Sequence, residues 1–140
     1  MESYVEMKAR HHKEIDALPI CYAFNKEQLD EAKKKLGDVP LATFGYGSVY
    51  RKADFGLINA VFDRHEEEHK KLREDYKELE EGFLYEMSNH EFNINQQGVE
   101  DVLRCFGMTE DDLKNPQIMA AWSKALKRYW ADIEANNNKE

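Results

Sequence analysis

Long apolar runs are absent from this sequence, and cysteine is scarce. No stretch reaches the roughly 18 consecutive apolar residues of a membrane-spanning helix, and residues 1–12 lack the apolar core of a secretory signal peptide. The 2 cysteines, Cys21 and Cys105, lie far apart and form no C-x-x-C pair. The sequence therefore predicts neither a disulfide framework nor a cysteine-based zinc site. We expect reduced thiols and a cytoplasmic location.

An excess of positive charge is also absent. The chain has 28 acidic and 20 basic residues, which gives a formal net charge of −8. Lysine and arginine are interleaved with glutamate instead of forming a stripe, and this pattern disfavours direct binding to the phosphate backbone of nucleic acids. An acidic surface of this kind stays compatible with a protein partner that carries basic residues.

Length and composition favour a single packed domain. The chain has 140 residues, of which 41% are hydrophobic and 34% charged. These proportions suit a packed interior beneath a well-solvated surface. We expect one globular domain over residues 1–135 and a frayed polar tail over residues 136–140.

Capping patterns and periodicity predict an α+β fold dominated by helices. Four segments have the spacing of helix N-terminal caps, and they begin at Ser3, Asn25, Thr109 and Asn115. Short runs of β-branched and aromatic residues at 20–24 and 41–52 favour strands. The sequence thus indicates about six helices with a small two- or three-stranded sheet.

The longest periodic run begins at Asp54. Apolar residues and histidines recur there every three or four positions as far as Leu79, which predicts one helix with one buried stripe. Gly82 is the expected kink or break after it. Such a helix would be roughly 39 Å long, more than a domain of this size easily covers. We therefore expect a homodimer that packs along it.

The segment HEEEH, which begins at His65, matches the pattern H-E-x-x-H. In metalloproteases two imidazoles one helical turn apart bind Zn²⁺, and the first glutamate is the general base. On this interpretation the protein is a zinc-dependent hydrolase that uses His65, Glu66 and His69, with His90 or Glu91 as a further ligand. The flanking residues are charged, however, and a glutamate-rich helix matches the pattern easily. The competing interpretation makes both histidines semi-buried members of the inner helix face.

A second candidate site follows two glycines. Gly45 and Gly47 lead into Tyr50, Arg51 and Lys52, and free amides beside two cations near a helix start would suit an anion or a nucleotide. The segment lacks the Walker pattern and the third glycine of a dinucleotide fingerprint, so an ordinary β-turn is the competing interpretation. In either case its tyrosine and arginine side chains offer a recognition surface.

The remaining histidine pair, His11 and His12, lies among basic residues of the first predicted helix. Adjacent helical residues point about 100° apart and cannot face one ligand. We expect this pair at the surface.

Four short motifs occur at 50–54 (YRKAD), 81–83 (EGF), 89–91 (NHE) and 106–110 (FGMTE). In this combination the chain resembles small uncharacterised proteins from phages and prophages of Gram-positive bacteria, over about residues 1–130. That family includes a histidine near position 65 but not the full H-E-x-x-H pattern. It has no assigned activity, so the resemblance implies a biological context and no catalytic residue.

Together these features predict a non-enzymatic accessory protein, encoded by a phage or prophage, that binds a protein partner or a small ligand and needs no cofactor. The zinc-dependent hydrolase and the anion or nucleotide binder stay open as alternatives.

Overall fold

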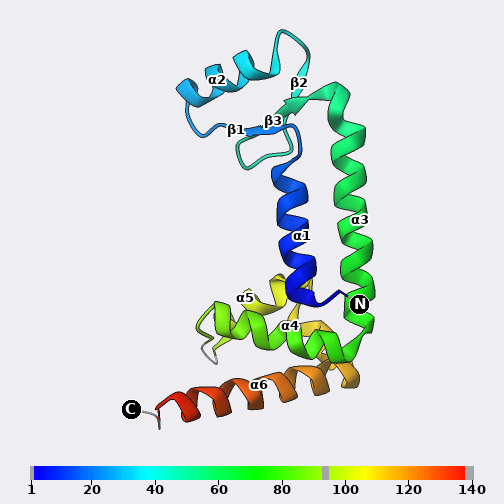
Figure 1. Ribbon diagram of the computed structural model, residues 1–140, viewed down its shortest axis with the longest axis vertical. Coiled ribbons are helices and arrows are strands. Elements are labelled where there is room, and N and C mark those ends of the chain that lie inside the picture. Colours follow the sequence, from blue (N-terminus) through cyan, green and yellow to red (C-terminus); the bar gives the residue numbers. More distant parts are fainter. Residues whose placement is uncertain (1, 93–94, 138–140) are drawn as a thin grey trace. The chain divides into compact units, whose positions relative to one another are not determined.

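The computed structural model describes residues 2–92 and 95–137 (Figure 1). Within these residues the elements in chain order are α1 (Tyr4–Asp16), β1 (Ile20–Tyr22), α2 (Lys26–Leu36), β2 (Leu41–Ala42), β3 (Ser48–Arg51), the 3₁₀ helix η1 (Lys52–Asp54), α3 (Phe55–Glu74), α4 (Tyr76–Asn89), α5 (Gln96–Arg104), the 3₁₀ helix η2 (Glu110–Lys114) and α6 (Pro116–Asn137). The predicted helix-dominated α+β class is confirmed. No helix among the described residues combines the length and apolar character that crossing a membrane requires.

The chain divides into two compact units. Unit 1 consists of Met1–Ala9 and Glu66–Glu140, and unit 2 consists of Arg10–His65. Both α1 and α3 contribute residues to each unit. The expectation of a single domain over residues 1–135 stays a prediction, and the last three residues of the expected tail lie outside the described part of the chain.

Unit 2 contains the sheet and α2. The strand order is β1-β3-β2 and both pairings are antiparallel, with Ile20 opposite Tyr50 and Leu41 opposite Arg51. Helix α2 packs against β1 and β3. Its predicted cap is present, since the Asn25 side chain accepts a hydrogen bond from the amide of Gln28 at 2.8 Å. The hydrophobic centre is small and consists of Leu18, Tyr50 and Ile58.

Unit 1 holds the larger core. Helix α4 lies along α6 and also contacts α5 (Figure 1). Phe83 on α4 meets Phe106 and Trp122 edge to face, with ring centroids 4.9 and 5.1 Å apart. Tyr4, from the first turn of α1, stacks on Phe106 at 4.8 Å. Aromatic pairs in this geometry add to the free energy gained by burying their area.

The long predicted helix is two helices. Helix α3 ends at Glu74, and Asp75 caps α4 by accepting a hydrogen bond from the amide of Glu78 at 3.3 Å. An aspartate in this position satisfies a donor that the helix itself leaves unpaired, and so stabilises a new helix start. The break therefore precedes Leu79 instead of following it. The homodimer expected from the longer helix stays a prediction.

Gly82 is inside α4, and its role is packing. A Cβ at this position would lie 2.8 Å from Cε1 of Phe106 and 3.1 Å from Cγ of Tyr4. Both rings are buried, so neither has free space to move into. The glycine that the sequence suggests as a helix breaker is thus required for close contact between α4 and its neighbours.

Replacing Gly82 by alanine tests this packing. We expect Gly82→Ala to lower the free energy of unfolding by about 1–3 kcal/mol, because overpacking outweighs the better helix propensity of alanine. Gly56→Ala in α3 is the matched control, since a Cβ there meets nothing within 4 Å. It should be neutral or stabilise by up to about 1 kcal/mol. Urea unfolding followed by circular dichroism measures both, and equal effects of the two substitutions would contradict the packing argument.

Candidate functional site

The glycine turn (residues 43–48) is held together by Ser48. This side chain is 1% exposed; its Oγ accepts a hydrogen bond from the amide of Phe44 at 3.0 Å and donates to the carbonyl oxygen of Gly45 at 2.7 Å. The amide of Gly45 donates to Oγ1 of Thr43 at 3.0 Å. These amides of the expected anion cradle are therefore engaged inside the turn itself.

The turn displays one tyrosine to solvent. Gly45, Tyr46 and Gly47 all have positive φ, at 96°, 54° and 77°, and Tyr46 is 90% exposed. A tyrosine in this conformation is strained by roughly 1–2 kcal/mol. Phe24, itself 74% exposed, lies over Gly47, where an added Cβ would come within 2.7 Å of its ring.

The other predicted ligand residues of this segment have structural contacts. Tyr50 is 5% exposed and belongs to the hydrophobic centre of unit 2. The Nε of Arg51 donates to the carbonyl oxygen of Leu36 at 2.6 Å, which satisfies an acceptor at the end of α2. Lys52 is exposed. The ligand-binding role expected for Gly45, Gly47, Tyr50, Arg51 and Lys52 stays a prediction.

His65 is buried within unit 2 and stacks on His11. The two rings lie 3.7 Å apart between centroids, with 16° between their planes, and Nε2 of His65 is 3.3 Å from Oε1 of Glu14. The surface position expected for His11 is wrong, because this side chain is only 6% exposed. It follows the buried Met7 by four residues and so occupies the same face of α1. His12 is exposed, as expected.

Two arginines control the charge of Glu14. Hydrogen bonds from Arg64, and then from His65 and Arg10, outweigh partial desolvation and lower the pKa of Glu14 to about 2. Burial, reinforced by the neighbouring His11, lowers the pKa of His65. The carboxylate is thus ionised and the imidazole of His65 is neutral near pH 7.

Ligand-type atoms of His11, Glu14 and His65 lie within 4.8 Å of one another. The rings are nearly parallel, however, and the lone pairs of face-to-face imidazoles run side by side instead of converging on one ion. Glu14 is already bound by two guanidinium groups. This geometry favours the interpretation of His65 as a buried, hydrogen-bonded histidine.

The remaining residues of the predicted zinc set occupy other places. Glu66 is exposed and His69 is half-buried on α3. Among the described residues two groups of potential metal ligands occur, one with His65 and the other with His90, and His69 belongs to neither. The hydrolase that combines His65, Glu66, His69 and His90 stays an alternative prediction.

The second group surrounds a buried carboxylate in unit 1. Glu86 on α4 is 0% exposed, and Nζ of Lys8 lies 2.9 and 2.8 Å from its two oxygens. The hydroxyl of Tyr4 donates to Oε2 at 2.9 Å. Close by, Sγ of Cys105 is 3.5 Å from Nε2 of His90. Carboxylate, thiol and imidazole lie within 4.8 Å of one another.

Charge and burial set the protonation states in this group. Burial opposes the charge of Glu86, but hydrogen bonds from Lys8, Cys105 and Tyr4 outweigh it and hold the pKa of this carboxyl below its usual value. Burial, then the hydrogen bond to Glu86, raises the pKa of the Cys105 thiol to about 12. Near pH 7 the thiol is therefore protonated and is a poor nucleophile.

Sequence reasoning singled out His90 but missed Glu86 and Cys105. One signal was present: Glu86 occupies an apolar stripe, three residues after Phe83 and next to Met87. A charged residue at a core position implies a partner. Its partners come from α1 and α5, which lie far away in the chain, so periodicity within α4 gave no indication of them.

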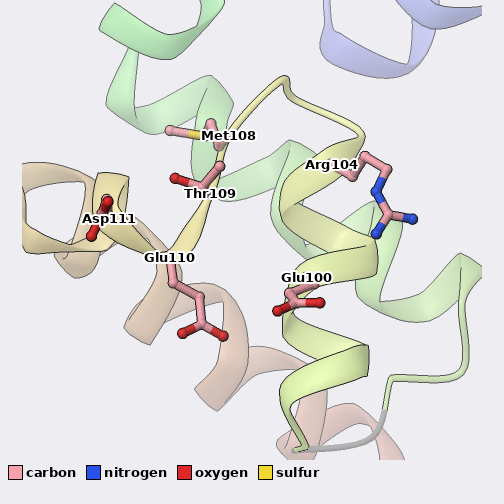
Figure 2. A pocket seen from close by; sticks show the side chains of 6 residues that line it. All are labelled: Glu100, Arg104, Met108, Thr109, Glu110 and Asp111. Atoms are coloured by element: carbon pink, nitrogen blue, oxygen red, sulfur yellow. The ribbon is translucent and has the colours of Figure 1, made fainter.

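A hollow of about 430 Å³ lies beside α5 and η2 (Figure 2). The residues that line it are Glu100, Arg104, Met108, Thr109, Glu110 and Asp111. In Figure 2 Arg104 extends away from Glu110 and Asp111. The polar side chains are exposed or half-exposed, so this hollow has the character of solvated surface.

A model of a family of unknown function, DUF7659, matches residues 3–128. A search of the curated proteins and a search of the solved structures gave no match. The match agrees with the expected resemblance to a family without assigned activity. It brings no catalytic residue, and the phage or prophage origin stays a prediction.

The depressed pKa of His65 predicts how stability depends on pH. In the unfolded chain this histidine titrates near its usual value, about 6.5, so as the pH falls the unfolded state takes up the proton first. The free energy of unfolding should therefore be greatest above about pH 7 and fall as the pH drops towards about 5.5. Glu14, with its pKa near 2, weakens the fold only at lower pH.

Unfolding by urea across this pH range measures the effect. In His65→Gln the slope should flatten, whereas the exposed His12→Gln should keep it. An unchanged slope in His65→Gln would exclude His65 as its source.

Proposed function

The chain belongs to DUF7659, a family of unknown function, and we propose that it is a binding protein that recognises a protein partner through the glycine turn of unit 2. The observation that carries this proposal is Tyr46, which is 90% exposed at the tip of the turn. Its backbone conformation is strained, and such strain persists where the surrounding structure enforces it. Here Ser48 and Thr43 enforce it with hydrogen bonds.

An exposed tyrosine on a fixed turn is suited to recognition. Tyrosine brings a large contact area with few rotatable bonds, and it is enriched among the residues that dominate binding energy. Because the turn is already ordered, little conformational entropy is lost when a partner binds. Because the Tyr46 side chain is 90% exposed, burial of its ring does not offset the backbone strain of roughly 1–2 kcal/mol. This supports a role for the side chain in binding.

Apolar side chains extend the surface around the turn. The large hydrophobic residues of unit 2 that are exposed are Tyr22, Phe24, Val39, Phe44, Tyr46, Phe55, Leu57 and Phe62. Phe24 lies over Gly47, and Phe44 approaches Phe62 with ring centroids 6.1 Å apart. Phe24, Phe44 and Phe62 thus lie at or near the turn, and exposed apolar side chains that lie together mark interaction sites on proteins.

Charge narrows the class of partner. Basic and acidic side chains are nearly equal in number in unit 2, so the acidic excess of the chain belongs to unit 1. The last turn of α2 carries Lys33, Lys34 and Lys35, and Lys52 begins η1 directly after β3. We therefore expect a protein surface that offers an apolar pocket for Tyr46 beside acidic side chains. The basic residues are too few and too intermixed with carboxylates for a nucleic-acid partner.

The biological setting is part of the proposal. The resemblance to phage and prophage proteins supports an accessory protein that acts in the bacterial cytoplasm. A second copy of the chain is the other occupant to consider for the same surface, and light scattering of the purified protein distinguishes it by mass.

The substitution Tyr46→Gly separates binding from folding. Glycine adopts positive φ without strain, so this variant should be at least as stable as the wild type. It should nevertheless lose at least about tenfold in affinity for the partner, as expected when a dominant aromatic contact is removed. The immobilised protein is exposed to bacterial extract, and the retained proteins are quantified by mass spectrometry and then titrated in purified form.

Trp130→Ser is the matched control, because Trp130 is an exposed aromatic residue of unit 1, at 41%. It should retain the same partner as the wild type. Equal retention of every protein by the wild type and by Tyr46→Gly would refute the proposal.

A further inference from the structure

Three potential metal ligands converge in unit 1. Glu86 and His90 are one helical turn apart, and the amide of His90 donates to the carbonyl oxygen of Glu86 at 3.0 Å, so the helical spacing extends to His90 at the C-terminal cap of α4. Cys105 is the corresponding cap of α5, which packs on α4. Residues four apart on a helix present their side chains on the same face.

The spacing of the ligand atoms fits one ion. Zinc binds thiolate sulfur at about 2.3 Å and imidazole nitrogen at about 2.0–2.1 Å, and a tetrahedral angle between the two bonds puts sulfur and nitrogen about 3.6 Å apart. The observed distance between Sγ of Cys105 and Nε2 of His90 is 3.5 Å. The Glu86 carboxylate lies within 4.8 Å of both atoms. Small side-chain movements therefore suffice to bring all three onto one ion.

From this geometry we propose that Glu86, His90 and Cys105 bind a Zn²⁺ ion, with a fourth position open to water. Thiolate and imidazole select zinc and similar transition metals over Mg²⁺ and Ca²⁺, which prefer oxygen ligands. As the zinc–sulfur bond forms, the proton of the Cys105 thiol is released to solvent. This site is independent of the glycine turn in unit 2.

The surroundings of Glu86 are suited to this role. The hydroxyl of Tyr4 and the side-chain amide of Asn89 donate to its oxygens at 2.9 and 3.4 Å and orient the carboxylate. Hydrogen bonds of this kind around a ligand tune metal affinity. His90 is exposed and Cys105 is half-buried, so the ion has an entry path from the side of His90.

Lys8 neutralises Glu86 in the absence of an ion. Its ammonium group contacts both carboxylate oxygens, and its side chain is 43% exposed. Zinc takes over one of these oxygens, and the long side chain of Lys8 then moves towards solvent. Lys8 is thus a competitor for the site, and its removal should strengthen zinc binding.

The test uses the full chain without an affinity tag, titrated with Co²⁺ as a spectroscopic probe and with Zn²⁺ against a chromophoric chelator. We expect one equivalent of metal and a sulfur-to-cobalt charge-transfer band. Cys105→Ser should abolish the band, and both Cys105→Ser and His90→Ala should weaken Zn²⁺ binding at least tenfold. Lys8→Met should bind Zn²⁺ more tightly than the wild type.

Cys105 and His90 each have a matched control of the same residue type. Cys21→Ser and His12→Ala should bind Zn²⁺ as the wild type does, and circular dichroism verifies that every variant is folded. Because His90 is exposed, His90→Ala gives a test even where Cys105→Ser fails to fold. Tyr46→Gly should keep its zinc, which separates this proposal from the proposed function.

Three results would overturn the site. They are the absence of stoichiometric binding, undiminished binding by His90→Ala, and loss of binding on His11→Ala with retention in Cys105→Ser. The last result would assign the metal to the histidine pair of unit 2.

Discussion

A buried carboxylate loses its hydration and needs opposite charge or hydrogen bonds from the protein in its place. Side chains of α1 provide both to Glu86. Lys8 supplies the opposite charge and Tyr4 a hydrogen bond, so the first turns of α1 are fastened to α4 within unit 1. Loss of one partner from such a group leaves a buried charge uncompensated, which costs several kcal/mol, about 3–5 for a buried ion pair. Burial of the Cys105 thiol, and then its hydrogen bond to Glu86, keeps this thiol protonated near pH 7. Glu86 thus holds α1 in position and adds to the effect of burial on its neighbour.

Local patterns predicted the starts of helices well, because a cap is decided by residues three positions apart. The side chains of Ser3 and Asn25 accept the hydrogen bonds that their spacing suggests, and at the third cap the amide of Thr109 donates to the carboxylate of Asp112. Asp75 was missed because the apolar stripe continues past it through Tyr76 and Leu79. Gly82 was misjudged because its role depends on the rings of Phe106 and Tyr4. The cap at Asp75 is local and was overlooked, whereas the contacts of Gly82 join segments far apart in the chain.

For the candidate sites too, the sequence predicted the features that depend on nearby residues and not the contacts between distant segments. The sequence indicated the glycine turn and the histidine at position 65, since both are marked by local pattern. It did not indicate that His65 meets His11 and Glu14, or that Cys105 meets His90 and Glu86, because these contacts join segments far apart in the chain. A motif therefore identified individual residues but not the residues that they contact.

Aromatic residues are used differently in the two units. In unit 1 they build the interior, where Phe83, Phe106 and Trp122 pack edge to face. In unit 2 Tyr50 is the only buried tyrosine or phenylalanine, and most of the others face solvent.

Unit 2 is also an insertion in the chain, because residues 10–65 separate the two segments of unit 1. His11 and His65, near the two ends of this insertion, stack with their ring centroids 3.7 Å apart. An insertion whose ends lie together can be exchanged for another without separating the flanking chain. The arrangement would therefore allow residues 10–65 to be replaced by another segment without separating residues 1–9 from residues 66–140.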